Sequence, residues 1–414
     1  MKRLIFLVAA GLIIAMPAIA GACQIPVFRY ALEKWDLTGY DILIYHDGPL
    51  PDDVRRELKK WLPASPEELQ KQKQGPQAPR ANVEITLIDL NGKLEGPALK
   101  LWEREGKKDK TPWMLVRSAA ASVKEPSAWS GPCTAANVQN VIDSPMRRAV
   151  LANLTRGASA VFVLLTSNDA KADRDAYVLA HKELKLLESR IKLPDQNDTT
   201  GPQIKLPLPL KVSFPLLVLD RDDPAEAIFI DMLLSTEDHL ADAKGPILFP
   251  IFGRGRVLLS LSRPSTGGGM FSKAQSEIAA DKLLFVAKFL CGPCSCQVKD
   301  LNPGVDMIMA ASWPAIFDQL YEGKEGVPLA KNDFNKMPAR YGTVSLEERA
   351  VESQTSNPPT TATPPVAIES VSTPGSPDYF RASLWIGIGV AAGLVLLTGG
   401  WLATRCCGRG SAPK

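Results

Sequence analysis

Histidine is scarce in this chain of 414 residues, and its scarcity limits the chemistry that the sequence can support. The three histidines, His46, His181 and His239, are far apart in the sequence, so none of them forms a paired zinc-binding motif. The chain also lacks the Gly-x-Ser-x-Gly elbow of serine hydrolases. We therefore expect no complete catalytic constellation, no catalytic residue and no cofactor.

An excess of charge of one sign is also lacking. The formal net charge is +3, and basic and acidic residues are well mixed along the chain. Aromatic residues make up 7% of the chain and are not interleaved with basic clusters, as they are in many nucleic-acid-binding proteins. We expect no nucleic-acid partner.

The N-terminus has the three parts of a secretory signal peptide. Lys2 and Arg3 precede an apolar run from Leu4 to Met16 that is too short to span a bilayer, and the small residues Ala18 and Ala20 follow it. We expect residues 1–20 to be a signal peptide that is cleaved after Ala20. The exported region would then face the periplasm or the extracellular space.

A long uncharged run near the C-terminus predicts a membrane-spanning helix. The run from Leu384 to Ala403 would span about 30 Å as a helix, which is the thickness of the hydrocarbon core. Trp385 and Trp401 stand near its two edges, where the headgroups lie. We place a single transmembrane helix at 382–404 and a cytoplasmic tail at 405–414, because the tail carries the basic residues Arg405, Arg409 and Lys414.

Two further features belong to this membrane-proximal region. Residues 346–381 are rich in serine, threonine and proline, a composition that favours an extended stalk over a packed core. Within the predicted span, Gly389 and Gly393 form a small-xxx-small pair that could bring two copies together as a homodimer.

The exported region predicts two domains, because the same kinds of element recur in its two halves. The first domain, 21–145, has strand-like runs and helical patterns at 26–35 (helix), 40–46 (strand), 52–61 (helix), 82–90 (strand), 111–117 (strand) and 136–142 (helix). The second, 146–345, ends in a cysteine-rich extension and has elements at 158–166 (strand), 173–191 (helix), 210–219 (strand), 224–234 (helix), 246–252 (strand), 256–261 (strand) and 273–290 (helix). This alternation favours the α/β class.

The order of these elements resembles that of the thioredoxin-like fold. The resemblance implies two thioredoxin-like α/β sandwich domains in tandem, followed by the transmembrane helix. Thioredoxin-like proteins carry a cis-proline at the start of their third core strand, and the matching positions here are Pro112 and Pro250. Two α/β sandwiches of another type remain the alternative.

Three stretches are also similar to a family of uncharacterised bacterial envelope proteins. They are Cys23 to Glu33, Phe252 to Arg256 and Cys294 to Gly304. This resemblance supplies a grouping among envelope proteins and no activity. We separately expect an envelope protein as partner. The sequence leaves the partner's identity open.

The stretch Cys291-Gly292-Pro293-Cys294 is letter for letter the dithiol motif of thioredoxins. In that family the motif opens a helix whose N-terminus lowers the pKa of the first thiol. Here it stands at the end of a domain, and a helix that began at the motif would soon meet Asn302-Pro303-Gly304. The loops where a catalytic pair would belong, His46 to Gly48 and Ser167 to Ala170, contain no cysteine.

Three interpretations therefore compete for Cys291, Cys294 and Cys296: a structural disulfide, a thiol-disulfide exchange site, and a soft-metal site for copper or zinc. Cys23 and Cys133 are further disulfide candidates, and Cys23 also follows a loose lipoprotein acylation box. The glycines and arginines from Gly253 to Arg256 indicate either an anion-binding loop or a hairpin turn.

These observations lead to one main hypothesis and one alternative. The main hypothesis is a non-enzymatic, membrane-anchored envelope protein that presents tandem domains as a binding or scaffold module. The alternative is a thiol-disulfide or metal-handling protein centred on the three clustered cysteines.

Overall fold

The computed structural model describes residues 24–35, 39–61, 81–196, 203–258, 260–261, 276–294, 313–324, 334–338 and 340. All of them belong to one compact unit, Ala22–Val344. The predicted signal peptide, stalk, membrane span and tail lie outside these residues, as do Gly389 and Gly393. Among the described helices, none is both long enough and apolar enough to cross a bilayer.

The first sheet has four strands in the order β2-β1-β3-β4. Its central strand β1 (Tyr40–His46) pairs in parallel with β2 (Val83–Asp89) and antiparallel with β3 (Trp113–Ser118). The short β4 (Trp129–Pro132) then pairs antiparallel with β3. The sheet is therefore mixed, with one open edge at β2 and the other at β4.

Helices cover both faces of the first sheet. On one face, α3 (Asp52–Trp61) and α6 (Ala135–Ile142) share a core with Ile42, Ile44 and Met114 of the strands. On the other face, α5 (Gly96–Glu105), which is followed by the 3-10 turn η1 (Lys108–Lys110), places Trp102 in a stack on Tyr45 at 5.0 Å between ring centroids. The side chain of Thr134 starts α6 by accepting a hydrogen bond from the Asn137 amide.

The second sheet repeats this arrangement in the order β6-β5-β7-β8. Its central strand β5 (Val161–Leu165) pairs in parallel with β6 (Leu216–Leu219) and antiparallel with β7 (Ile247–Phe252). The two-residue β8 (Arg256–Val257) completes it. All of β5 is buried, because its alternate side chains enter two cores, one on each face of the sheet.

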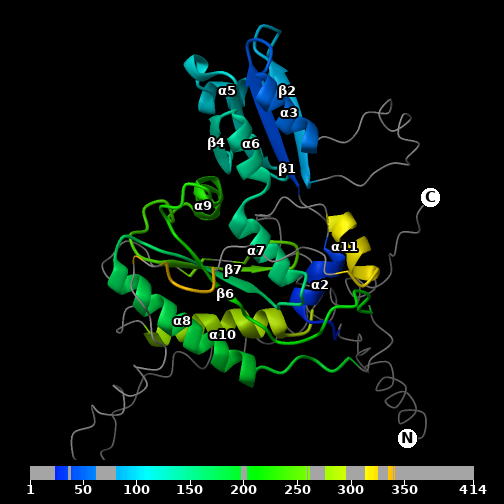
Figure 1. The fold of residues 1–414 in the computed structure, drawn as a ribbon, viewed down its shortest axis with the longest axis vertical. Helices are drawn as coiled ribbons and strands as arrows, with labels where there is room; N and C mark the ends of the chain where they lie inside the picture. Colours follow the sequence, from blue (N-terminus) through cyan, green and yellow to red (C-terminus); the bar gives the residue numbers. More distant parts are fainter. Residues whose placement is uncertain are drawn as a thin grey trace, which may run out of the picture. The chain divides into compact units, whose positions relative to one another are not determined.

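Three helices pack on each face of the second sheet (Figure 1). One face carries α2 (Val27–Lys34), α8 (Ala170–Arg190) and α10 (Ser276–Cys291). The other carries α7 (Pro145–Leu154), α9 (Ala227–Leu234) and α11 (Trp313–Tyr321). Each half of the chain thus runs strand, helix, strand, helix, two antiparallel strands and helix, with α2, α7 and α11 added to the second half.

The two halves share buried contacts through α9. Its Ile228 and Met232 belong to the core of the first sheet, whereas Phe229 and Leu233 on the same helix belong to the core of the second. The carboxylate of Glu226, just before α9, accepts hydrogen bonds from the Ser144 hydroxyl and the Met146 amide, both at 2.6 Å. These contacts tie the start of α7 to the start of α9.

The structure confirms the mixed α/β class and most of the expected elements, but it corrects two expectations. The helix α2 was assigned to the first domain, 21–145, whereas its apolar face packs on the second sheet. The bond Thr111–Pro112 is cis, directly before β3, but within the described residues no second cis bond occurs, so the expectation for Pro250 is wrong.

The position of Pro250 explains this difference. Pro250 lies inside β7 and faces Phe162, whereas Pro112 precedes its strand. On its other side, β7 pairs Ile251 with Val257, but further along it pairs Leu248 with Leu261. The second pair is out of register with the first by one residue. Proline has no amide hydrogen to donate to the neighbouring strand. A sheet tolerates a proline where the strand pairing is irregular, as it is at this register shift in β7.

Candidate functional site

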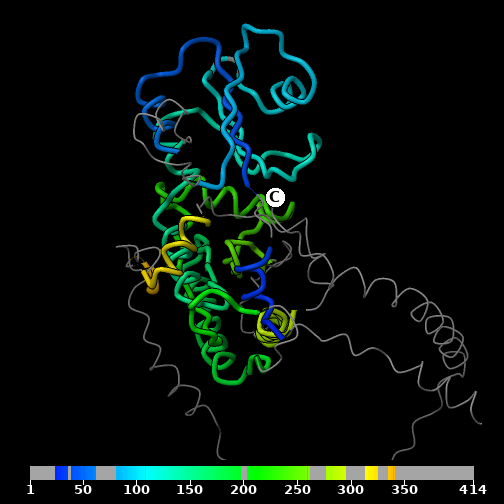
Figure 2. The backbone as a smooth tube through the Cα atoms, turned by 90° about the vertical axis from the view of Figure 1, so that its right-hand side faces the viewer, coloured from blue at the N-terminus to red at the C-terminus, as the bar shows by residue number. Residues whose placement is uncertain are grey.

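The cysteine motif forms a backbone joint with the N-terminal segment. Cys291 is the last residue of α10, so the motif follows a helix and does not open one. The Val27 amide donates to the Gly292 carbonyl at 3.0 Å, and the Cys294 amide donates to the Ile25 carbonyl at 2.8 Å. Figure 2 shows the dark-blue N-terminal segment against the yellow-green α10. The motif therefore anchors the start of the described chain.

The thiol of Cys291 is poorly suited to nucleophilic chemistry. Burial raises the pKa of Cys291 to about 12, although a hydrogen bond with the Ser159 side chain partly opposes this shift. The carboxyl end of a helix carries negative partial charge, which disfavours a thiolate, whereas a helix N-terminus favours one. Cys291 therefore stays protonated at neutral pH.

Among the described residues, the other cysteines do not complete a metal-binding group. Cys133 is buried beside α6, and burial raises its pKa to about 12. The thiols of Cys133 and Cys291 are free, and Cys294 is buried. Cys23 and Cys296 lie outside the described residues. Within the part that is described, no three histidine, cysteine or acidic residues come together as a metal site.

The loop that follows the central strand β5 contains capping residues. At the start of α8, the Asp169 carboxylate accepts hydrogen bonds from the amides of Lys171 and Ala172, at 2.9 and 3.0 Å. The buried Asp173 accepts from the amide and the hydroxyl of Ser167, at 2.7 and 2.8 Å. These contacts fix the loop after β5 and define the start of α8. They place polar oxygen atoms, not sulfur, at the helix N-terminus.

The turn from Gly253 to Arg256 is a hairpin that holds α2. Gly253 and Gly255 have φ angles of 56° and 93°, which connect β7 to β8. The guanidinium of Arg254 donates to the carbonyls of Leu32 and Glu33 at 2.7 and 3.1 Å, and so satisfies the carboxyl end of α2. The Arg256 guanidinium lies 4.8 Å from the ring centroid of Trp35. Both guanidinium groups thus contact the carboxyl-terminal end of α2, which favours the hairpin interpretation over an anion-binding loop.

A buried ion pair within α2 binds the backbone of residues 205–208, and the sequence analysis did not predict it. Arg29 is fully buried and its Nε lies 2.8 Å from Oε1 of Glu33. Arg29 also donates to the carbonyls of Leu206 and Leu208, while the Glu33 carboxylate accepts from the amides of Lys205 and Leu206. Arg29 and Glu33 stand four residues apart in a helix, which was the available signal.

These contacts define one assembly, the α2 joint, made of α2, the turn 252–256 and the segment 291–294. The described parts of all three stretches that carry the envelope-family resemblance lie in it. The joint is closely packed and most of its described polar contacts are internal, although Nη1 of Arg29 and the indole nitrogen of Trp35 are buried without a hydrogen-bond partner among the described residues. It therefore has the character of a structural centre.

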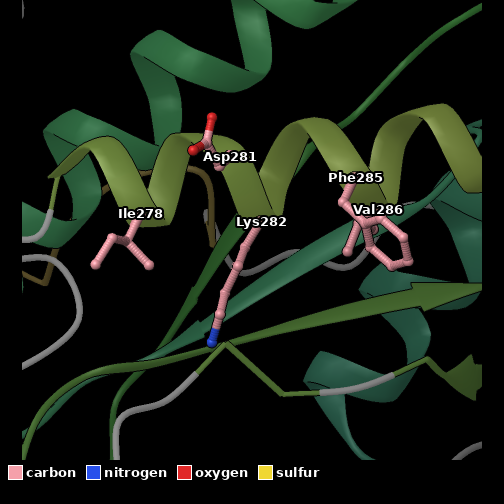
Figure 3. A pocket seen from close by; sticks show the side chains of 5 residues that line it. All are labelled: Ile278, Asp281, Lys282, Phe285 and Val286. Atoms are coloured by element: carbon pink, nitrogen blue, oxygen red, sulfur yellow. The ribbon is translucent and has the colours of Figure 1, made fainter. Parts of the chain in front are cut away.

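A shallow hollow of about 390 Å³ lies on the outer side of α10 (Figure 3). Ile278, Asp281, Lys282, Phe285 and Val286 line it. In Figure 3 the side chains of Ile278, Lys282 and Phe285 point to one side of the helix, and Asp281 points to the other. All five residues belong to one helix, and Asp281 and Lys282 are the ionisable groups among them, so the hollow has the character of a helix surface.

The chain matches no protein-family model, no curated protein and no solved structure.

Proposed function

We propose that the chain is a non-enzymatic, membrane-anchored envelope protein whose exported part presents two thioredoxin-like domains as a binding or scaffold module. The repeated order of strand, helix, strand, helix, two antiparallel strands and helix supports the tandem thioredoxin-like assignment. The signal peptide and the C-terminal apolar run of the sequence support the envelope location and the membrane anchor. The tail would remain in the cytoplasm.

The observation that carries the non-enzymatic part is the placement of the cysteine motif. Thioredoxin-type exchange needs an accessible thiolate at a helix N-terminus. Cys291 instead ends α10 and is buried, and burial raises its pKa to about 12. The helix N-terminus after β5 carries Asp169 as its cap. Both facts weigh against the alternative of a thiol-disulfide or soft-metal protein.

A trapping experiment tests the proposal in cells. In an exchange enzyme, loss of the second cysteine of the motif leaves mixed disulfides between the first cysteine and its substrates. We expect the full chain carrying Cys294→Ser to run on non-reducing gels without such adducts, as the wild type does. Adducts that depend on Cys291, and that vanish in the double variant with Cys291→Ser, would replace the proposal with the exchange function.

A further inference from the structure

The outer edge of β2 is an open row of backbone hydrogen-bonding groups. Among the described strands, β2 pairs with β1 alone. The Tyr40 amide donates to Asn82 and the Leu90 amide donates to His46, so even-numbered residues of this segment direct their backbone groups to β1. Successive residues of a strand direct these groups to opposite sides. The amides and carbonyls of the odd-numbered residues Val83, Ile85 and Leu87 therefore point to the outer edge, whereas the Asp89 carbonyl accepts from the Gly92 amide at 3.2 Å.

The corresponding edge of the second sheet is covered by the chain itself. β6 pairs in parallel with its central strand as β2 does, and its Val218 amide donates to the Phe334 carbonyl at 2.7 Å. The Tyr177 hydroxyl holds the next residue by donating to the Asn335 carbonyl at 2.9 Å. In the part of the chain that the structure describes, β2 has no such cover, although with seven residues it is longer than the four-residue β6.

The side chains of β2 indicate what kind of strand would fit there. Leu87 is 52% exposed, and β2 contains neither the proline nor the lysine that commonly protects an open edge. Glu84 stands directly beside Asp41 across the β1–β2 pair, and Arg117 of β3 stands on the other side of Asp41 and partly balances its charge. A basic side chain on an added strand would lie beside Glu84, the acid nearer the edge, and an apolar one would cover Leu87.

We propose that the edge of β2 binds an extended segment of a partner protein, with alternating apolar and basic residues, by adding it to the first sheet as a further strand. Main-chain hydrogen bonds to the odd-numbered residues of β2 would supply affinity, and Glu84 and Leu87 would supply selectivity. This inference deepens the proposed binding function and rests on it, because it names the chemistry of the partner.

Synthetic peptides test the inference on the full chain in detergent. A fluorescent ten-residue peptide of alternating valine and lysine is expected to bind, and the same peptide with glutamate in place of lysine is not. N-methylation of one alternate set of amides should abolish binding, while methylation of the other set should leave it, because a strand uses one set only. If methylation of either set of amides changes binding equally, the peptide is attracted by charge alone, and strand addition is overturned.

Variants of the chain test the selectivity. Glu84→Lys is expected to lower the affinity for the lysine peptide by about fivefold, because it replaces a favourable cross-strand charge pair with a repulsive one. Glu103→Lys, on the exposed surface of α5, is the matched control and should leave affinity unchanged. Equal weakening by both variants, or no binding at all, would overturn the inference. If the peptides do not bind and the trapping experiment also shows no thiol exchange, strand addition is wrong but the proposed function stands. If the trapping experiment shows thiol exchange, the proposed function is wrong, irrespective of peptide binding.

Discussion

Cys133 and Cys291 illustrate how burial controls the reactivity of a side chain. Each would read as an available thiol from the sequence, and Cys291 belongs to a motif with a well-known chemistry. In the structure burial raises the pKa of both to about 12, and neither faces a cation that would oppose the shift. A sequence motif specifies which atoms are present, whereas reactivity depends on the helix end and the solvent that surround them.

Alkylation rates measure this directly. We expect Cys133 and Cys291 of the native full chain to react with iodoacetamide at pH 8 far more slowly than the same residues in urea, because they are buried and protonated. An engineered thiol at Tyr321→Cys, a position 53% exposed, is the control and should react at once. Peptide mass spectrometry identifies the labelled residues. Labelling of Cys291 as fast as the control would show that the motif is accessible.

The acidic pair on the first sheet predicts a pH dependence of stability. Burial raises the pKa of Asp41, and the neighbouring charge of Glu84 raises it further. An acid whose pKa is raised by folding is protonated more readily in the folded chain, so its contribution is full at low pH and is lost as pH rises through that pKa. We expect Glu84→Gln to raise the free energy of unfolding by about 0.2–1 kcal/mol at pH 7.

Urea unfolding at several pH values checks this expectation. The gain from Glu84→Gln should shrink towards pH 3, because the Asp41 carboxyl, whose pKa is raised, becomes protonated and the repulsion is lost. Glu183→Gln, on α8, is the matched control and should change stability by less than about 0.5 kcal/mol at every pH. A gain that is the same at pH 3 and pH 7 would show that the repulsion between the two acids is not its cause.

At the scale of elements, many regular ones followed from the sequence, whereas β4, α5 and the regular helices α7 and α11 were not predicted. The β-branched and apolar runs of β1 and β5 and the helical spacing of α3 and α8 predicted those elements within a few residues. β4 was missed because its four residues include Gly131 and Pro132, which are poor strand formers. α5 was missed for a related reason, since it begins at Gly96-Pro97.

The α2 joint was beyond prediction because it depends on tertiary contacts. The sequence marked its three segments as notable but could not show that they meet, since α2 lies more than 200 residues from the other two. Its tightness has a local cause at Gly253, where an added Cβ would lie 2.8 Å from the Cβ of Ala31. Glycine is therefore required there for space as well as for its φ of 56°.

A pair of alanine substitutions separates these two requirements. Gly323, after α11, also has a positive φ, of 75°, but a Cβ there would meet nothing within 4 Å. We expect Gly323→Ala to lower the free energy of unfolding by about 1–2 kcal/mol, because alanine is strained in this backbone conformation. Gly253→Ala should cost about 1–3 kcal/mol more, because it also forces α2 and the turn apart. Urea unfolding of both variants measures the difference, and equal losses would contradict the close packing of the joint.

At the scale of the whole molecule, the anchor and export signals predict a defined orientation. If the basic tail is cytoplasmic as proposed, protease added to intact cells or spheroplasts should digest the exported region and spare a green fluorescent protein fused after Lys414. A chain truncated before residue 382 should be released from the membrane and serves as the control. Digestion of the fused protein in sealed spheroplasts would contradict this orientation.

The central claim is that the exported region works through its surfaces and not through its thiols. The most direct test is to equilibrate the full chain in glutathione buffers from about −280 to about −120 mV and count its reactive thiols, with copper and zinc measured on the same samples. The account predicts a thiol count that does not change with potential and no bound metal. A pair of cysteines that titrates with a measurable potential, or a stoichiometric copper or zinc ion, would contradict it.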